Sequence, residues 1–281
     1  MQAMICWDGV HFSWKKQGDA ARENVLTNID LQIAPGSFVC ILGANGSGKS
    51  TLAKLANGLF LPTGGRVYAA GMDTMDESLL YEIRRRIGLV FQNPDNQIVN
   101  SIVADDVAFA PENLGILPEE IAARVDEALS AVRMDGYRGH ATHLLSGGEK
   151  QRLAIAGILA MRPECIVLDE PTAMLDPLGR AEVLETILRL RAEFGITIVL
   201  ITHHMNECTG ADRLIVLDQG RVALDGVPRD VFHEVQKLRA LGLELPQTVQ
   251  VQQALYEAGI ALPHNALTVA ETIENIAAAL R

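Results

Sequence analysis

One segment of the sequence combines glycines, a lysine and hydroxyls at a spacing suited to binding phosphate. Residues 43–50 read Gly-Ala-Asn-Gly-Ser-Gly-Lys-Ser and match G-x-x-x-x-G-K-[ST] at every fixed position. The glycines let backbone N–H groups turn toward phosphate oxygens, Lys49 would reach the β- and γ-phosphates, and Ser50 would ligate Mg²⁺. Several classes of nucleotide enzyme share such a loop, so it predicts a nucleotide but not a class. The predicted contacts are Gly43, Asn45, Gly46, Ser47, Gly48, Lys49, Ser50 and Thr51.

A pair of carboxylates supplies candidates for the reaction itself. Asp169 and Glu170 directly follow the apolar run Cys-Ile-Val-Leu at 165–168. They are therefore predicted to emerge at the carboxyl end of a strand, where α/β sheets hold their ligands. Asp169 can position hydrated Mg²⁺, and Glu170 can accept a proton from an attacking water as a general base. A solvated surface pair is the weaker alternative, because four apolar residues precede it.

A third segment predicts a second anion site. Residues 145–152 read Leu-Ser-Gly-Gly-Glu-Lys-Gln-Arg and lead into an apolar helix over 153–161. The hydroxyl of Ser146, the N–H groups at Gly147 and Gly148 and the start of a helix together suit an anion. Because the chain already has one phosphate loop, this second half-site is best explained if it serves the nucleotide of a partner subunit.

The elements that must position these residues alternate along the chain. Short apolar runs bounded by turn signals recur at 38–42, 87–91, 165–168, 196–201 and 214–217. Helical patterns lie between several of these runs, which predicts a parallel α/β sheet. Residues 118–134 predict a helical insert, while Asp176-Pro177 and Gly195 bracket a further helix. Past about residue 226 the strand pattern fades, so 227–281 is predicted to hold short helical segments.

Charge and composition exclude several classes of function. With 24 Lys and Arg against 35 Asp and Glu, the formal net charge is −11, so nucleic acid is not an expected partner. No apolar run reaches the roughly 18 residues of a membrane-spanning helix. The N-terminal residues show no secretion signal, so we expect the cytosol. The cysteines are spread singly, and Cys40 and Cys165 lie in apolar runs, which predicts core positions rather than a metal or redox site.

The order of these motifs resembles that of the ATP-binding-cassette (ABC) family, and the resemblance covers about residues 1–226. The segment 145–149 matches the family signature Leu-Ser-Gly-Gly-Gln apart from Glu149 at its last position. The implied fold is α/β: a P-loop NTPase core of ABC type with a helical subdomain at about 93–162. Residues 227–281 would form a small C-terminal appendage that serves subunit contacts.

The resemblance also implies how ATP and Mg²⁺ would be bound. Members of the family form a head-to-tail dimer with two ATP molecules. Each ATP would be held by the phosphate loop and Asp169 of one subunit and by Ser146, Gly147 and Gly148 of the other. Asp176, in the position of the family's D-loop, would contribute to the shared site.

Three further positions acquire expected roles from the resemblance. Gln92, in the Q-loop position, would sense Mg²⁺ and the attacking water while touching a transmembrane partner. His203 would contact the γ-phosphate as the switch residue; it is preferred over His204 because it directly follows Thr202. Trp14 falls where the family places a ring on adenine, although it could equally close a first strand. The expected catalytic residues are thus Glu170, His203 and Gln92, and the expected metal ligands Ser50, Gln92 and Asp169.

One part of the sequence is similar to a particular branch of the family. Residues 92–97 (Gln-Asn-Pro-Asp-Asn-Gln) and 105–109 (Asp-Asp-Val-Ala-Phe) look like the Q-loop region of energy-coupling factor (ECF) ATPases, which power vitamin and metal-ion importers. The similarity implies an ATPase on the cytoplasmic face of the cell membrane. Its expected partners are a second ABC ATPase, identical or paralogous, a transmembrane coupling protein and a membrane-embedded substrate-binding protein. Asp105 or Asp106 would face a groove for the coupling protein, or else only cap a helix.

Other readings of the motifs remain open or are disfavoured. An ATPase of another ABC transporter class, or a regulatory ABC ATPase without a transporter, fits the same motifs. A DNA-repair or chromosome ATPase would need a long coiled coil between Lys49 and Ser146, where no sustained heptads occur. A ribosome-associated member would usually carry two cassettes, whereas this chain carries one.

Overall fold

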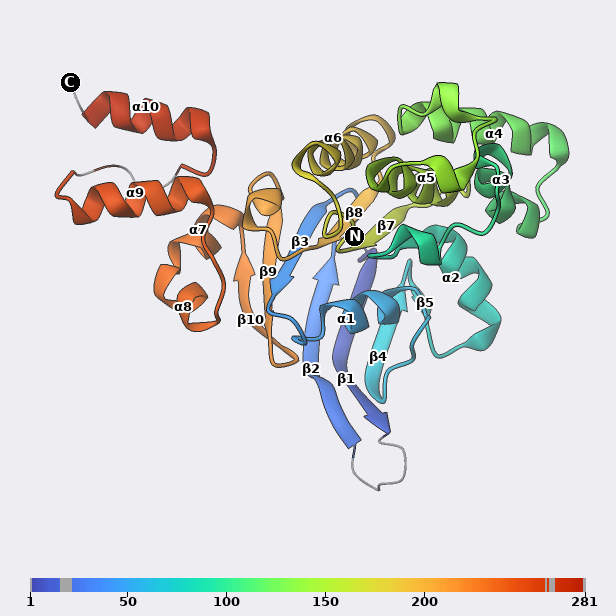
Figure 1. The fold of residues 1–281 in the computed structure, drawn as a ribbon. Helices are drawn as coiled ribbons and strands as arrows, with labels where there is room; N and C mark the ends of the chain where they lie inside the picture. Colours follow the sequence, from blue (N-terminus) through green and yellow to red (C-terminus); the bar gives the residue numbers. More distant parts are fainter. Residues whose placement is uncertain (1, 16–21, 261, 263–265, 280–281) are drawn as a thin grey trace.

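A six-stranded sheet forms the centre of the structure, a computed structural model that describes residues 2–15, 22–260, 262 and 266–279 (Figure 1). In spatial order its strands are β10 (Arg221–Gly226), β9 (Arg213–Asp218), β3 (Phe38–Gly43), β8 (Thr197–Ile201), β7 (Cys165–Asp169) and β6 (Ile87–Val90). Strands β9, β3, β8, β7 and β6 are parallel, and β10 pairs antiparallel with β9. The predicted parallel sheet is therefore confirmed, with each apolar run forming a strand.

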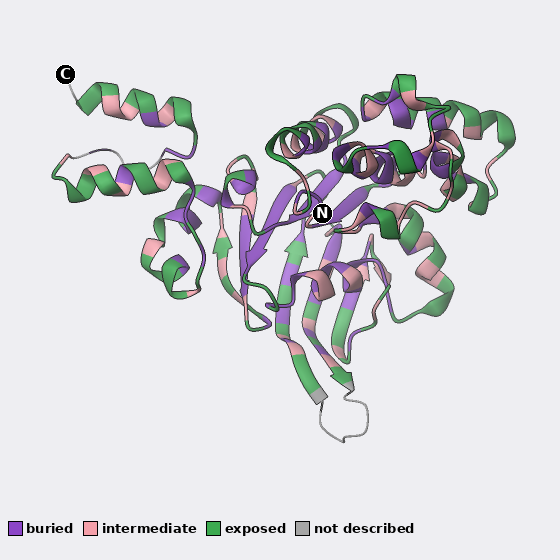
Figure 2. Ribbon diagram, in the orientation of Figure 1, coloured by how far each residue is buried: buried purple, intermediate pink, exposed green. Residues whose placement is uncertain are grey.

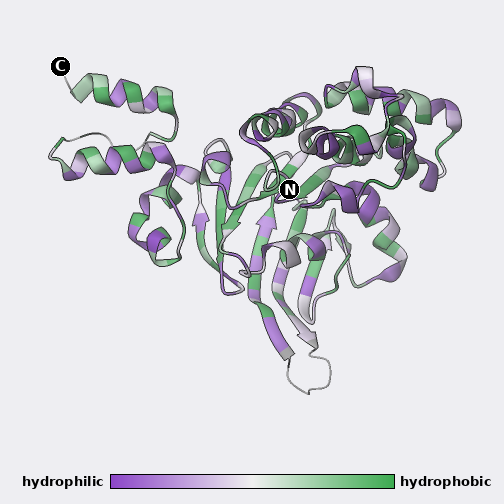
Figure 3. Cartoon of the chain, viewed as in Figure 1, coloured by the Kyte–Doolittle hydropathy of each residue, from purple (hydrophilic) through white to green (hydrophobic). Residues whose placement is uncertain are grey.

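The central strands are buried on both faces, which explains their uninterrupted apolar runs. Every residue of β3, β6, β7 and β8 is buried, as expected for a parallel sheet covered on both sides. Successive residues of a strand point to opposite faces. Accordingly, Cys40 packs with the helices on one face, whereas Ile41 packs with a second sheet on the other. Figures 2 and 3 show these strands as the most buried and among the most apolar parts of the molecule.

A second, antiparallel sheet was not predicted from the sequence. Its strands, in spatial order, are β2 (Arg22–Ile33), β1 (Ile5–Lys15), β4 (Gly64–Ala69) and β5 (Met72–Asp73). Trp7 and Ile29 of this sheet share one buried cluster with Ile41 of β3 and Leu52 of α1 (Lys49–Ala56). The helix that follows the phosphate loop is therefore held between two sheets, which fixes the loop at its start.

Helices cover the opposite face of the central sheet (Figure 1). They are α3 (Val103–Asn113), α4 (Pro118–Ala131), α5 (Gly147–Leu159) and α6 (Pro177–Phe194), while α2 (Leu80–Arg86) leads into β6. Helix α4 confirms the predicted helical insert, although it ends at Ala131 because the chain turns at Arg133 with φ of 56°. The predicted bounds of α6 are confirmed: Asp176 caps its start, and Gly195 ends it with φ of 65°.

The C-terminal residues form α7 (Pro228–His233), α8 (Val235–Ala240), α9 (Gln247–Glu257) and α10 (Val269–Ala279). Phe232 and Leu238 are fully buried and belong to the same core cluster as the central sheet. Helices α9 and α10 project beyond it and are largely exposed in Figure 2. No helix in the described part of the chain is long and apolar enough to span a membrane.

A carboxylate organises the start of α10. Glu271 accepts hydrogen bonds from the guanidinium of Arg229 and from the backbone N–H groups of Leu267 and Thr268. The Arg229 bond, followed by the two backbone bonds, lowers the pKa of Glu271 to about 2. This carboxylate therefore joins α7 to α10 in its ionised form.

Candidate active site

The phosphate loop has a backbone that only glycine accommodates easily at two positions. Gly46 and Gly48 adopt φ of 80° and 101°, in the region that L-residues with a Cβ seldom occupy. A Cβ on Gly48 would also lie 2.6 Å from Leu26 Cδ2 and 3.1 Å from Val25 O. The loop is thus shaped by its glycines and pressed against β2, with the α1 N-terminus directly behind it.

The lysine of the loop is buried and folded over the loop's own carbonyls. Lys49 Nζ donates to Gly43 O at 2.8 Å and to Ala44 O at 3.0 Å, and lies 3.8 Å from Glu170 Oε1. Burial lowers the pKa of Lys49, while the charges of Glu170 and Asp169 raise it in opposition. A single ammonium therefore lies between the phosphate loop and the two carboxylates of β7.

Two oxygens beside this lysine suit a hard divalent cation. Ser50 Oγ donates to Asp169 Oδ1 at 2.9 Å, which joins the start of α1 to the end of β7. Burial raises the pKa of Asp169, and the Ser50 hydrogen bond lowers it. Mg²⁺ usually takes one or two protein oxygens together with substrate phosphates and water. These donors fit Mg²⁺, and no cluster of three or more His, Cys, Asp or Glu suited to a metal occurs among the described residues.

The three predicted catalytic side chains meet at one edge of the sheet. Glu170 Oε2 accepts a hydrogen bond from Gln92 Nε2 at 3.1 Å and lies 3.5 Å from His203 Nδ1. Gln92 follows β6, Glu170 follows β7 and His203 follows β8, so the sheet topology alone brings them together. Glu170 has φ of 49°, an uncommon value for a residue other than glycine that tends to occur at functional sites.

The geometry distinguishes the two adjacent histidines. The side chain of His203 is 42% exposed and lies beside Glu170. His204 turns inward: burial lowers its pKa, and its Nε2 has no hydrogen-bond partner. The rings are 4.0 Å apart, yet only His203 forms the contact with Glu170 described above.

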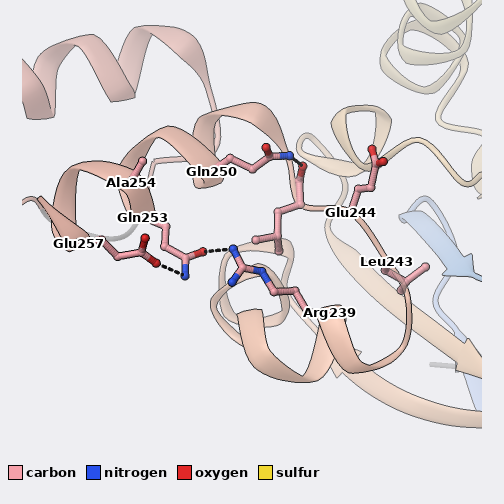
Figure 4. A pocket seen from close by; sticks show the side chains of 8 residues that line it. Arg239, Leu243, Glu244, Gln250, Gln253, Ala254 and Glu257 are labelled. Carbon is pink, nitrogen blue, oxygen red and sulfur yellow. Dashed lines mark hydrogen bonds between the residues drawn. The ribbon is translucent and has the colours of Figure 1, made fainter.

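An open cavity of about 970 Å³ lies in front of these groups. Its lining includes Gly43, Asn45, Gln92, Glu170 and His203, together with residues 242–245 before α9 and Gln247 and Gln250 at the start of α9. A neighbouring cavity of about 510 Å³ opens between α8 and α9, where Gln253 accepts a hydrogen bond from Arg239 and donates one to Glu257 (Figure 4). The first cavity, with phosphate-binding and catalytic groups on its wall, is the one suited to nucleotide chemistry.

The predicted second half-site is a separate cavity of about 550 Å³. Ser146 is the N-cap of α5, and its Oγ accepts from Glu149 N, while Glu149 Oε2 accepts from Ser146 N. Tyr137 Oη donates to the other oxygen of Glu149 at 2.5 Å. Glu149 thus forms a capping box, which explains physically why Glu suits this position. Gly147 and Gly148 lie on the wall of the same cavity.

Two other predicted residues, Asp176 and Trp14, lie outside the nucleotide cavity. Asp176 lines the second cavity and caps α6 by accepting from Gly179 N at 3.0 Å. Trp14 is 47% exposed and packs edge-on against Phe12 and Phe60, at centroid distances of 4.9 and 5.1 Å. It does not line the nucleotide cavity among the described residues, so its contact with adenine stays a prediction. Of the remaining predicted contacts, Ser47 is buried within the phosphate loop, and Thr51 is half-buried next to the loop on α1.

The acidic pair after the Q-loop divides into two environments. Asp106 is buried, and its Oδ1 accepts from the backbone N–H groups of Val99 and Asn100 at 2.8 and 2.9 Å. Burial raises the pKa of Asp106, and these two hydrogen bonds lower it in part. Asp105 is exposed. Asp106 therefore holds the preceding loop, whereas the side chain of Asp105 is accessible to solvent.

Sequence reasoning missed three polar residues beside the site. Arg180 and Glu207 line the nucleotide cavity, and the fully buried Thr172 hydrogen-bonds to Glu207. These residues belong to three separate segments of the sequence, and no local motif joins them. Only the folded chain shows that they meet.

Comparison with known proteins shows the family of the chain. The sequence matches the ABC transporter family over residues 26–173. It is 57% identical over 260 residues to the energy-coupling factor transporter ATP-binding protein EcfA1 of Caldanaerobacter subterraneus subsp. tengcongensis, covering 92% of this chain and 94% of that protein. It is 46% identical to the protein of the same name in Bacillus subtilis, covering 94% of this chain and 93% of that one.

Solved structures show the same architecture. The structure of cbiO1 from Clostridium perfringens, part of the ABC transporter complex cbiONQ, has a TM-score of 0.76 at 35% identity and covers 88% of this chain and 97% of that one. The dimeric ATP-binding cassette MJ0796 bound to ADP and Pi has a TM-score of 0.72 at 33% identity and covers 80% and 99%. The chain belongs to the ABC transporter ATPases and, within them, to the energy-coupling factor transporter ATP-binding proteins.

Proposed function

We propose that the chain hydrolyses Mg·ATP at sites that two ATPase subunits share in a head-to-tail dimer. The observation that carries this proposal is the separation of the two half-sites, because their cavities have no lining residue in common. Ala173 and Arg180 line the first cavity, and Asp176, between them in sequence, lines the second. An ATP on the phosphate loop would therefore be enclosed by Ser146 of another subunit. The dimeric form of MJ0796, which shares this fold, supports such an arrangement.

Within one shared site, each contact supports a role. Lys49 and the loop N–H groups would neutralise the phosphates, and Ser50 and Asp169 would hold Mg²⁺, which stabilises the charge of the transferred phosphoryl group. Glu170 would accept the proton of the attacking water. Gln92 and His203 would orient that water and the γ-phosphate, since both lie within 3.5 Å of the Glu170 carboxylate.

A groove on the helical side suits a transmembrane partner. A cavity of about 730 Å³ opens between α2 and α3, with Leu59, Tyr81 and Phe109 as exposed apolar side chains. An apolar groove of this kind can receive a helix presented by another protein. We assign it to the coupling protein of the transporter; Asp105 would then contact the same partner from beside the groove.

Membership of this family supports a physiological role in import. We propose an importer for a vitamin or a transition-metal ion, in which the chain works peripherally on the cytoplasmic face of the membrane with a membrane-embedded substrate-binding protein. Residues 1–226 would be the nucleotide-binding domain, with its helical subdomain at about 93–162. Residues 227–281 would serve subunit contacts, which the exposed faces of α9 and α10 support.

Mixing two inactive variants tests the shared site. Lys49→Ala removes the phosphate loop's charge, and Ser146→Arg blocks the half-site offered to the other subunit. If sites are shared, a dimer with one copy of each variant has one site with both lesions and one intact site. ATP hydrolysis should then reappear on mixing, with mixed dimers counted by native mass spectrometry. Mixed dimers that form and remain inactive would refute the shared site.

A further inference from the structure

Glu207 is a buried carboxylate next to the active site that the proposed mechanism leaves without a role. It lies in the short helical turn Met205–Cys208, and its side chain is only 2% exposed. A carboxylate in such a place is costly unless its oxygens are hydrogen-bonded. Both oxygens are: Oε2 accepts from Thr202 Oγ1 at 2.6 Å, and Oε1 accepts from Thr172 Oγ1 at 2.8 Å.

The partners of Glu207 belong to the segments that carry the chemistry. Thr202 directly precedes His203, and its hydroxyl oxygen also accepts the N–H of His204 at 3.0 Å. Thr172 follows Glu170 by two residues. Arg180 Nε lies 3.9 Å from Glu207 Oε1. Arg180 is in the first turns of α6, the helix capped by Asp176 at the second half-site.

We infer that Glu207 is a positioning residue that holds three segments in one arrangement: the loop that carries His203, the turn that carries Glu170 and the start of α6. Through Thr202 it fixes the backbone that carries His203, and through Thr172 it fixes the turn that carries Glu170. It thereby maintains the 3.5 Å approach of His203 Nδ1 to Glu170 Oε2. Because Arg180 belongs to α6, the same carboxylate links the nucleotide cavity to the half-site presented to the other subunit. The inference rests on the proposed roles of Glu170 and His203.

The chemistry of the contact requires a carboxylate. Each threonine hydroxyl donates one hydrogen, and an ionised carboxylate can accept at both oxygens. An amide has one accepting oxygen and one donating nitrogen, so Glu207→Gln leaves one threonine hydrogen without its acceptor although the side-chain shape is kept. The loop carrying that threonine is then free to shift.

The test measures ATP hydrolysis by the full-length chain in its dimer. Glu207→Gln and Thr202→Val should each lower kcat about ten- to hundredfold, since small misplacements of catalytic groups have effects of this size. ATP affinity should stay within about twofold, because the phosphate loop is not touched. Thr202→Ser restores the hydroxyl and should recover most of kcat. Glu193→Gln is the matched control, since Glu193 is an exposed carboxylate on α6 outside the nucleotide cavity.

A double-mutant cycle separates positioning from stability. In a His203→Ala background, Thr202→Val should lower kcat by less than about twofold, because Thr202 acts on the loop of His203 and the group it positions is gone. A full, additive loss in that background, or wild-type kcat for Glu207→Gln and Thr202→Val, overturns the inference. The proposed function is tested separately by the single variants His203→Ala and Glu170→Gln. Wild-type hydrolysis by both variants would refute the catalytic roles proposed for His203 and Glu170.

Discussion

Replacing Glu170 by Gln tests the centre of the proposed mechanism. The substitution keeps the length and nearly the volume of the side chain. The new amide oxygen can still accept the hydrogen bond that Gln92 Nε2 donates to Glu170 Oε2 at 3.1 Å in the wild-type chain. It removes the negative charge 3.8 Å from Lys49 Nζ and the ability to accept a proton from water. The backbone φ of 49° at this position suits Gln as well as it suits Glu, so the turn should keep its conformation. Chemistry should therefore be lost while the architecture of the site is retained.

The size of the effect follows from the role assigned to the carboxylate. A general base contributes about two to four decades in rate, and each decade corresponds to about 1.36 kcal/mol of activation free energy. The expected loss of transition-state stabilisation is thus about 2.7–5.4 kcal/mol. ATP binding should be unchanged or tighter, since a carboxylate that would repel the γ-phosphate and competes for Lys49 is gone. ATP-bound dimers should accumulate as a result.

Single-turnover hydrolysis of radiolabelled ATP and equilibrium binding measure the two effects separately. Glu164→Gln is the matched control: Glu164 precedes the same strand at its opposite end and forms an exposed ion pair with Arg86. That variant should hydrolyse ATP at the wild-type rate, because exposed pairs contribute about 0–1 kcal/mol to stability and nothing to chemistry. A rate for Glu170→Gln within about threefold of the control would refute the assignment of the base.

Four further outcomes are expected. Phe109→Ser should weaken retention of the chain by membranes containing its partner and leave ATPase activity intact, whereas Leu188→Ser, equally exposed on α6, should change neither; equal retention of both would contradict the docking groove. Asp106→Ala should lower the free energy of unfolding by about 1–3 kcal/mol in urea denaturation, because two backbone donors lose their acceptor. Asp105→Ala should have little effect on the free energy of unfolding but weaken membrane retention. Unchanged retention would indicate that Asp105 only caps the helix. Glu271 has a folded-state pKa of about 2, below its usual 4.5, so its ionised form stabilises the fold above about pH 4.5 and this contribution is lost as pH falls toward 2. The unfolding free energies of wild type and Glu271→Gln should therefore differ at pH 7 and converge in that window, and a difference that persists at pH 3 undiminished would exclude this linkage.

The sequence shows its local chemistry clearly. The phosphate loop, the carboxylates after β7 and the half-site at Ser146 each lie within a few consecutive residues, and their spacing is dictated by the chemistry they perform. The parallel sheet was equally visible, because strands buried on both faces must be apolar at every position. Asp176 could be identified as the cap of α6 for a similar reason, since its partner Gly179 is three residues away.

Features that depend on distant pairing were decided only by the tertiary structure. The antiparallel sheet was missed because β1 has irregular register against both neighbours, which breaks the two-residue alternation expected of a half-exposed strand. The different environments of Asp105 and Asp106 depend on how the preceding loop folds back over α3. Glu207 shows the same principle most clearly: its partners Thr172 and Arg180 are distant in sequence, and a carboxylate is recognised as part of a site only once burial and its two hydroxyl donors are known. Local chemistry is encoded in short motifs, whereas the contacts that align one motif with another arise when the chain packs.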